Sequence, residues 1–144
     1  LRPLAALAAL VVVAGCATVP YTNRTQLLLT SEAQETALGA QMYQHVLAEE
    51  PLVRDAKLIA PVREVGERIA AVAGRPDYRW EFNVIDAPDV ANASVLPGGK
   101  VIVYSGLFPV ARDTGGLAAV LAHEVGHAIA RHGGERMSQT AVMQ

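Results

Sequence analysis

The chain has 144 residues, of which 51% are hydrophobic. This length allows one domain with a core of its own and no more. A formal net charge of −2 and a pI near 6.1 exclude the basic surface that nucleic-acid binding requires, so we expect no nucleic-acid partner. The sequence begins at Leu1 and ends at Gln144 inside a predicted helix, so we expect it to be a fragment of a longer protein.

Residues 1–15 have the composition of an export signal. Arg2 is the only charge, and residues 4–14 form an unbroken apolar run. The run is shorter than the roughly 20 residues that span a bilayer, but it fits the apolar region of a signal peptide. A buried core helix is the alternative, and it is disfavoured because the run has no polar face. We therefore predict a signal peptide at residues 1–15.

The only cysteine of the chain follows this run directly. Val13-Ala14-Gly15-Cys16 resembles the lipobox of bacterial lipoproteins, which implies that Cys16 is lipidated and becomes the first mature residue. No second cysteine is available for a disulfide within the chain. By the same analogy, Ala17 in place of Asp favours an outer-membrane anchor that faces the periplasm. Residues 16–30 are then a lipidated tether.

Two helices are predicted after the tether. Ser31 and Gln34 fit a capping box, and Pro51 ends the first helix near Glu49. The side of this helix expected to face the core carries Leu38, Met42 and Val46. A second helix is expected at residues 56–73, ended by Gly74. Its apolar stripe consists of Leu58, Val62, Val65, Ile69 and Val72.

The next segment has the pattern of a small β-sheet. Trp80, Phe82 and Val84 alternate with polar residues, as on a half-buried strand. Residues 91–96 are a weaker strand candidate, and residues 100–105 are the clearest one because they are rich in Val and Ile. We expect residues 106–109 to break this strand before the next helix. The predicted fold class is α+β.

The last predicted helix carries the sequence's main chemical signal, His123-Glu124-Val125-Gly126-His127. On a helix, positions i and i+4 share a face, so the two imidazoles can bind one metal ion. Zinc held in this way lowers the pKa of water to about 7, and a carboxylate can take the proton and return it to the leaving amine. The pattern therefore predicts His123 and His127 as zinc ligands and Glu124 as the catalytic residue of peptide-bond hydrolysis.

Catalytic zinc sites usually have a third protein ligand. Ala130 and Gly133 stand where a metzincin has its Gly and its third His, which excludes that class. On one continuous helix, His132 is expected to point to a different face from His123 and His127. Glu135 lies too far along the helix axis to bind the same metal ion. We expect the third ligand to be a Glu beyond Gln144, as in gluzincins.

Three segments together resemble one family of gluzincins, that of HtpX, BepA and LoiP, with Oma-type and CAAX-prenyl-protease relatives. They are HEVGHAIARHGGERMSQ at residues 123–139, NASVLPGGKVIVYSGL at 92–107 and RTQLLLTSEAQETALG at 24–39, and the last is similar to the bacterial lipoprotein branch. The resemblance implies a zincin-like fold with N-terminal helices, a small sheet and then the active-site helix. Residues 31–144 would be the N-terminal part of the peptidase domain, with one Zn²⁺ per subunit.

The resemblance also implies the substrates, which are misfolded or unassembled membrane-associated proteins of the envelope. We expect an extended substrate to pair with the strand that carries Lys100, Val101, Ile102 and Val103. One alternative is a non-catalytic lipoprotein that assists outer-membrane assembly as a chaperone or scaffold. A scaffold has no need for Glu124, which favours the enzyme. A zinc-storing or zinc-sensing lipoprotein is a third hypothesis, disfavoured because two ligands on one helix retain metal weakly.

Overall fold

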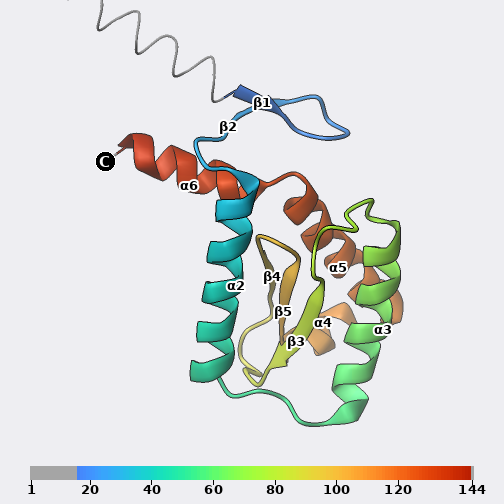
Figure 1. Ribbon diagram of the computed structural model, residues 1–144. Coiled ribbons are helices and arrows are strands. Elements are labelled where there is room, and N and C mark those ends of the chain that lie inside the picture. The colour runs from blue at the N-terminus through green and yellow to red at the C-terminus, as the bar shows by residue number, and fades with distance from the viewer. Residues whose placement is uncertain (1–15, 144) are drawn as a thin grey trace, which may run out of the picture.

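The computed structural model describes residues 16–143, so the predicted signal peptide lies outside the described residues. Helices and a small sheet are mixed, as predicted for an α+β fold (Figure 1). No helix in the described part of the chain is long and apolar enough to cross a membrane. In chain order the elements are β1 (Cys16–Thr18), β2 (Thr25–Leu27), α2 (Glu32–Glu49), α3 (Ala56–Val72), β3 (Glu81–Ile85), β4 (Ala93–Leu96), β5 (Lys100–Tyr104), α4 (Leu107–Ala111), α5 (Thr114–Ile129) and α6 (His132–Met143).

A three-stranded sheet in the order β3-β5-β4 forms the centre of the fold. The middle strand, β5, pairs in parallel with β3 and antiparallel with β4. Helices α3 and α5 lie on one side of the sheet and α2 on the other (Figure 1). Because both faces are covered, β5 is apolar from Val101 to Val103, and every residue from Lys100 to Val103 is buried.

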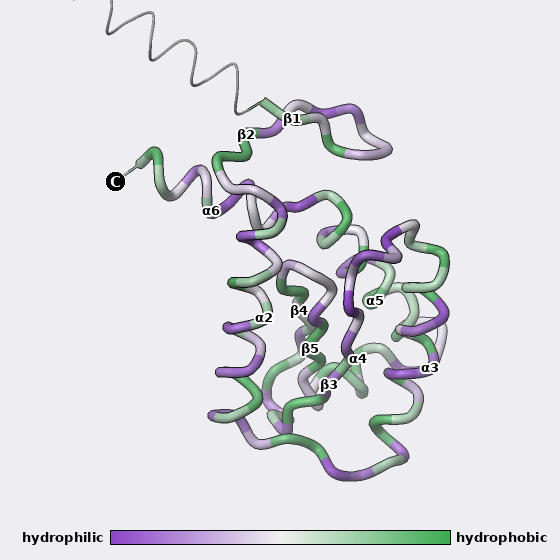
Figure 2. Tube along the Cα trace, viewed as in Figure 1, coloured by the Kyte–Doolittle hydropathy of each residue, from purple (hydrophilic) through white to green (hydrophobic). Residues whose placement is uncertain are grey.

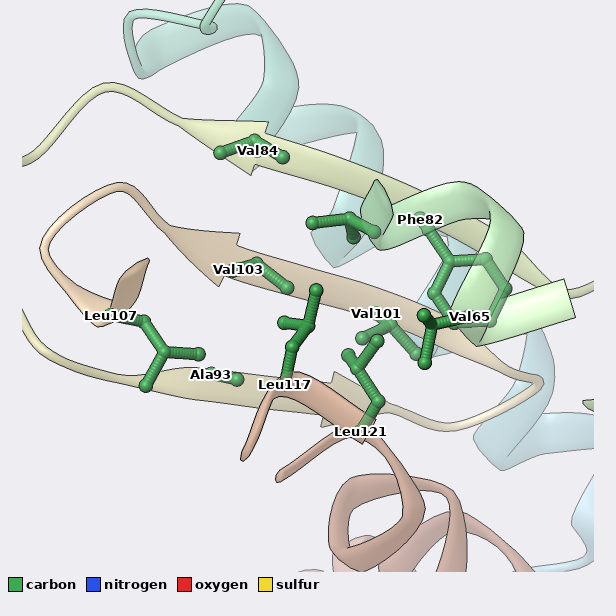
Figure 3. Close-up of a cluster of buried hydrophobic side chains, with 10 residues drawn as sticks. Val65, Phe82, Val84, Ala93, Val101, Val103, Leu107, Leu117 and Leu121 are labelled. Atoms are coloured by element: carbon green, nitrogen blue, oxygen red, sulfur yellow. The ribbon is translucent and has the colours of Figure 1, made fainter. Parts of the chain in front are cut away.

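The main core lies between the sheet and the pair α3 and α5. Phe82 and Val84 from β3 and Val101 and Val103 from β5 meet the apolar sides of the two helices (Figure 3). Val62 and Val65 come from α3, and Leu117 and Leu121 come from α5. On the opposite face of the sheet, Ile102 and Ile85 pack against Tyr43 of α2. This packing fixes α5, the helix with the His-Glu-His sequence, firmly to the sheet.

Helix α2 begins as predicted but buries a different face. Ser31 forms the capping box with Gln34, and its amide donates to Oε1 of Gln34 at 2.9 Å. Figure 2 shows hydrophobic and hydrophilic residues alternating along this helix. Val46 of the predicted apolar side packs against the core, but Leu38 and Met42 are 41% and 46% exposed, so the prediction is wrong for these two residues. The helix instead turns the face of Gly39 and Tyr43 toward the sheet. A Cβ atom on Gly39 would lie 2.3 Å from the carbonyl oxygen of Pro97, so only glycine permits this approach.

Helix α3 has the predicted bounds to within one residue. Val62 and Val65 of the predicted stripe are buried, whereas Val72 at its end is almost fully exposed. Gly66 allows the helix to approach the ring of Phe82, because a Cβ atom there would lie 2.4 Å from a ring carbon. The stripe prediction is therefore right for the middle of the helix and wrong for its last turn.

The predicted break after β5 is a short helix, α4, which contains Pro109. Gly116 in the first turn of α5 makes room for it, because a Cβ atom at this position would lie 2.0 Å from the carbonyl oxygen of Ala111. The glycine weakens the helix by its own propensity, and here close packing requires it.

The segment predicted as a tether is a two-stranded antiparallel hairpin, β1 with β2. Val19 and Gln26 of this hairpin are buried, and β2 contacts α6. Arg24 binds both carboxylate oxygens of Glu135 on α6, at 2.7 and 2.6 Å. The hairpin is thus docked on the body of the domain near the end of α5, and it starts with the exposed Cys16 (Figure 1).

Candidate metal centre and active site

Helix α5 has one buried side and one side that carries the ionisable residues. Leu117, Leu121, Val125 and Ala128 are its buried residues. The side chain of Asp113 caps the helix by accepting from the amide of Gly116 at 2.9 Å. The buried side fixes the helix against the sheet, so its other residues hold a defined position.

His123 and His127 lie side by side on α5, as their spacing predicts. Their Nε2 atoms are 2.9 Å apart, and the rings meet edge to face with centroids 4.4 Å apart. His123 is exposed, and His127 is half-buried. The pair therefore presents two imidazole nitrogens to one point at the surface of the helix.

A cleft of about 380 Å³ lies between α5 and strand β4. Glu124 and His127 line one side of it, and β4 with Asn92 and Pro97 lines the other. Within residues 16–143, β4 pairs with β5 alone. The second edge of β4 is therefore the sheet edge that borders the cleft.

The predicted substrate-binding residues do not lie at this edge. Lys100, Val101, Ile102 and Val103 belong to β5, whose backbone already pairs with a strand on each side. Their side chains are buried, and Nζ of Lys100 donates to Glu81 at 2.6 Å. The expectation that a substrate strand pairs with this segment is wrong, because strand order cannot be derived from strand pattern.

Tyr78 also lines the cleft and joins a polar cluster with Arg75 and Glu32. Its hydroxyl donates to Glu32 at 2.8 Å, and Arg75 forms an ion pair with the same carboxylate. Burial, with the hydrogen bond to Glu32, raises the pKa of Tyr78 to about 12. Burial alone would raise the pKa of Glu32, but the hydrogen bonds from Arg75 and Tyr78 outweigh it and hold that pKa below its ordinary value.

The predicted single helix after the His-Glu-His sequence is divided by a tight turn. Arg131 has a left-handed backbone with φ of 54°, and α6 begins at His132. Nδ1 of His132 is in hydrogen-bond contact with Nδ1 of His127, and the ring centroids are 4.8 Å apart. Burial lowers the pKa of His132, and the neighbouring His127 lowers it further. The expectation that His132 points away from the site is therefore wrong.

A buried ion pair holds this turn. Arg131 binds both oxygens of Glu35 on α2, at 3.0 and 2.7 Å, and donates to the carbonyl oxygen of Thr30 at 3.2 Å. Hydrogen bonding to Glu35 holds the pKa of Arg131 above its ordinary value. Glu35 is 2% exposed and also accepts from the Thr30 hydroxyl at 2.7 Å. No periodic pattern in the sequence predicted this role for Glu35.

Comparison with known proteins identifies the family. Residues 57–144 match peptidase family M48. The chain belongs to this family. Over 127 residues it is 40% identical to the mitochondrial metalloendopeptidase OMA1 of Schizosaccharomyces pombe. The aligned region covers 85% of this chain and 37% of the relative.

Two further relatives of this M48 chain are more distant. The β-barrel assembly-enhancing protease of Yersinia pestis is 33% identical over 99 residues, or 69% of this chain and 20% of the relative. Human mitochondrial metalloendopeptidase OMA1 is 32% identical over 125 residues, or 81% of this chain and 24% of the relative. The chain thus spans well under half the length of these curated relatives.

Membership of family M48 implies a divalent metal, and the side chains of α5 fit one in part. In a tetrahedral zinc site with bonds of about 2.0–2.1 Å, two ligand nitrogens lie roughly 3.3 Å apart. The separation of 2.9 Å between the Nε2 atoms of His123 and His127 is close to this value. Between Cys16 and Met143, no group of three or more His, Cys, Asp or Glu side chains could hold a metal ion. The two imidazoles therefore supply part of a ligand set.

Proposed function

We propose that this chain belongs to a zinc-dependent metalloendopeptidase of the bacterial cell envelope. Its substrates would be misfolded or unassembled membrane-associated proteins. The observation that carries the proposal is the placement of His123, Glu124 and His127 on one fixed helix beside an open cleft. A third ligand, a Glu from beyond Gln144, would complete the site, as in other gluzincins.

In this mechanism the residues of α5 divide the work. Nε2 of His123 and Nε2 of His127 would hold the metal through their lone pairs. When bound, zinc acts as a Lewis acid and lowers the pKa of water enough for it to react near neutral pH. The carboxylate of Glu124 accepts the proton of the attacking water and passes it to the nitrogen of the leaving amine. Peptide hydrolysis then needs no covalent intermediate with the protein.

The edge of β4 suits an extended polypeptide better than a compact ligand. Backbone groups along this edge border the cleft, so a substrate strand can add to the sheet there by main-chain hydrogen bonds. Such pairing selects for unfolded segments, since a folded protein has no backbone free to pair. This supports misfolded or unassembled proteins as substrates.

The envelope location rests on the N-terminal sequence. Cys16 follows the lipobox-like residues and is exposed at the start of the hairpin, where lipidation would anchor the domain. One relative is named for enhancing β-barrel assembly, and β-barrels are proteins of the outer membrane. We therefore place the protein at the outer membrane, facing the periplasm. Replacing Cys16 with Ser should release the protein into the soluble fraction, and unchanged membrane association would contradict the anchor.

The decisive test of the enzyme is Glu124→Gln in the full-length protein. This variant should bind one zinc ion per chain, as the unmodified protein does, because Glu124 is not a proposed ligand. Its cleavage of unfolded casein should fall by about 10²–10⁴-fold, the usual contribution of a general base. Cleavage at the normal rate would refute the mechanism. If neither protein cleaves casein but both promote outer-membrane assembly, the chaperone or scaffold becomes the better account.

A further inference from the structure

We infer that His132 is a positioning residue for the metal ligand His127, and that its Nδ1 accepts a hydrogen bond from Nδ1–H of His127. The inference rests on the proposed function, because it assumes that His127 binds the metal. It assigns to His132 the task of fixing which nitrogen of His127 is free to bind.

The two nitrogens of His127 face different partners. Nε2 faces Nε2 of His123, and Nδ1 is in contact with Nδ1 of His132. A neutral imidazole carries one proton and one free lone pair. If Nε2 of His127 binds a metal together with His123, its proton must be on Nδ1. Nδ1 of His132 is then the acceptor, and the proton of His132 is on Nε2.

This geometry also excludes His132 as a ligand of the same ion. His132 meets the Nδ1 side of the His127 ring, and His123 meets the Nε2 side. A single ion cannot contact both sides of one imidazole. His132 therefore lies behind the ligand, where partners that orient metal-binding histidines are commonly found.

The turn after α5 is what brings His132 to this place. On a continuous helix, a residue five positions after His127 would lie about 140° around the axis from it. The left-handed backbone of Arg131 interrupts the helix instead, and α6 begins at His132 in a new direction. The ion pair with Glu35 and the bond to Thr30 hold the side chain of Arg131 on α2. Gly134 then packs so closely on the Glu35 carboxylate that a Cβ atom would lie 2.2 Å from its oxygen.

Two substitutions of nearly equal size separate a hydrogen-bond role from a packing role. His132→Asn keeps an acceptor oxygen near the position of Nδ1, and His132→Leu removes it. Zinc affinity of the full-length protein is measured by competition with a chelator. We expect His132→Leu to weaken zinc binding about 10–100-fold, the usual effect of losing such a partner, and His132→Asn to restore most of it. Equal losses in both variants, or no loss in either, would overturn the inference.

A measurement on the unmodified protein covers the case in which His132→Leu fails to fold. With ¹⁵N-labelled histidine and bound zinc, the imidazole nitrogen shifts report which nitrogen carries the proton in each histidine, including His127 and His132. We expect a protonated Nδ1 in His127 and an unprotonated Nδ1 in His132. A protonated Nδ1 in His132 would overturn the inference. If the protein binds zinc but leaves casein intact, only the proposed protease fails; if it binds no zinc, both fail.

Discussion

Removing one partner of the buried ion pair between Glu35 and Arg131 should destabilise the fold strongly, and Arg131→Met tests this. The substitution keeps an unbranched apolar stem but removes the guanidinium, and it leaves a carboxylate that is 2% exposed without its cation. Removing one partner of a buried pair costs about 3–5 kcal/mol. The Thr30 hydroxyl still donates to Glu35, and Arg131 is itself 20% exposed. We therefore expect the lower end, about 3 kcal/mol of unfolding free energy.

Glu35→Gln should cost less, although it breaks the same pair. The amide oxygen of glutamine can still accept one hydrogen bond from Arg131, and water can reach the unpaired guanidinium. A loss of about 1–2 kcal/mol is expected, as for a hydrogen bond to a charged group. The double variant should lose less than the sum of the two single losses, because the second change removes an interaction that is already broken.

Urea unfolding followed by circular dichroism measures these losses of unfolding free energy. Each loss appears as a shift in the urea midpoint at an unchanged dependence of the free energy on urea concentration. Arg24→Met is the matched control, since Arg24 also binds a carboxylate with two hydrogen bonds but is 49% exposed. Its loss should be much smaller than that of Arg131→Met, because water screens the exposed pair. An Arg131→Met loss below about 1 kcal/mol, or one equal to the Glu35→Gln loss, would refute the reasoning.

Three further predictions concern packing, pH and metal. Gly116→Ala should destabilise by about 1–3 kcal/mol, because the new methyl group meets the carbonyl of Ala111. Gly126 has open space around it, so Gly126→Ala should stabilise the folded state by up to about 1 kcal/mol through helix propensity. Equal changes in unfolding free energy for the two variants, measured by urea unfolding, would contradict this prediction. The lowered pKa of Glu32 contributes stability above its unfolded pKa of about 4.3, and this is lost as pH falls through the folded pKa. Thermal unfolding of Glu32→Gln should accordingly show a flatter decline below pH 4.3 than the unmodified protein, and parallel curves would refute it. Removing zinc with EDTA should lower the melting temperature of the loaded protein, and an unchanged temperature would argue against a metal that binds the folded state.

The sequence predicted best those features that depend on near neighbours. The capping box at Ser31, the spacing of His123 and His127 and the apolar run of β5 are all read within a few residues, and the structure contains each of them. The buried side of α2 was missed because it depends on a distant contact. Gly39 meets the turn at Pro97, and this contact sets the rotation of the helix.

The turn after α5 was missed for a similar physical reason. Local signals there favour a continuing helix, since Arg131 is a good helix former and glycine appears only two residues later. The left-handed backbone is held by an ion pair to Glu35, which lies 96 positions away in the chain. A single sequence contains no sign of that pairing. His132 consequently contacts the ring of His127, whereas a continuous helix would have placed it on another face.

The last prediction concerns Ile102, which lies on β5, the middle strand of the sheet. The family resemblance led to the expectation that this residue lies at the substrate, whereas the structure packs it against Tyr43 and Ile85. Ile102→Val removes one buried methylene and should cost about 0.5–1.5 kcal/mol in urea unfolding. Because no substrate can reach a strand that is paired on both sides, KM for a peptide substrate should not change. A several-fold rise in KM with unchanged stability would show that β5, and not the edge of β4, meets the substrate.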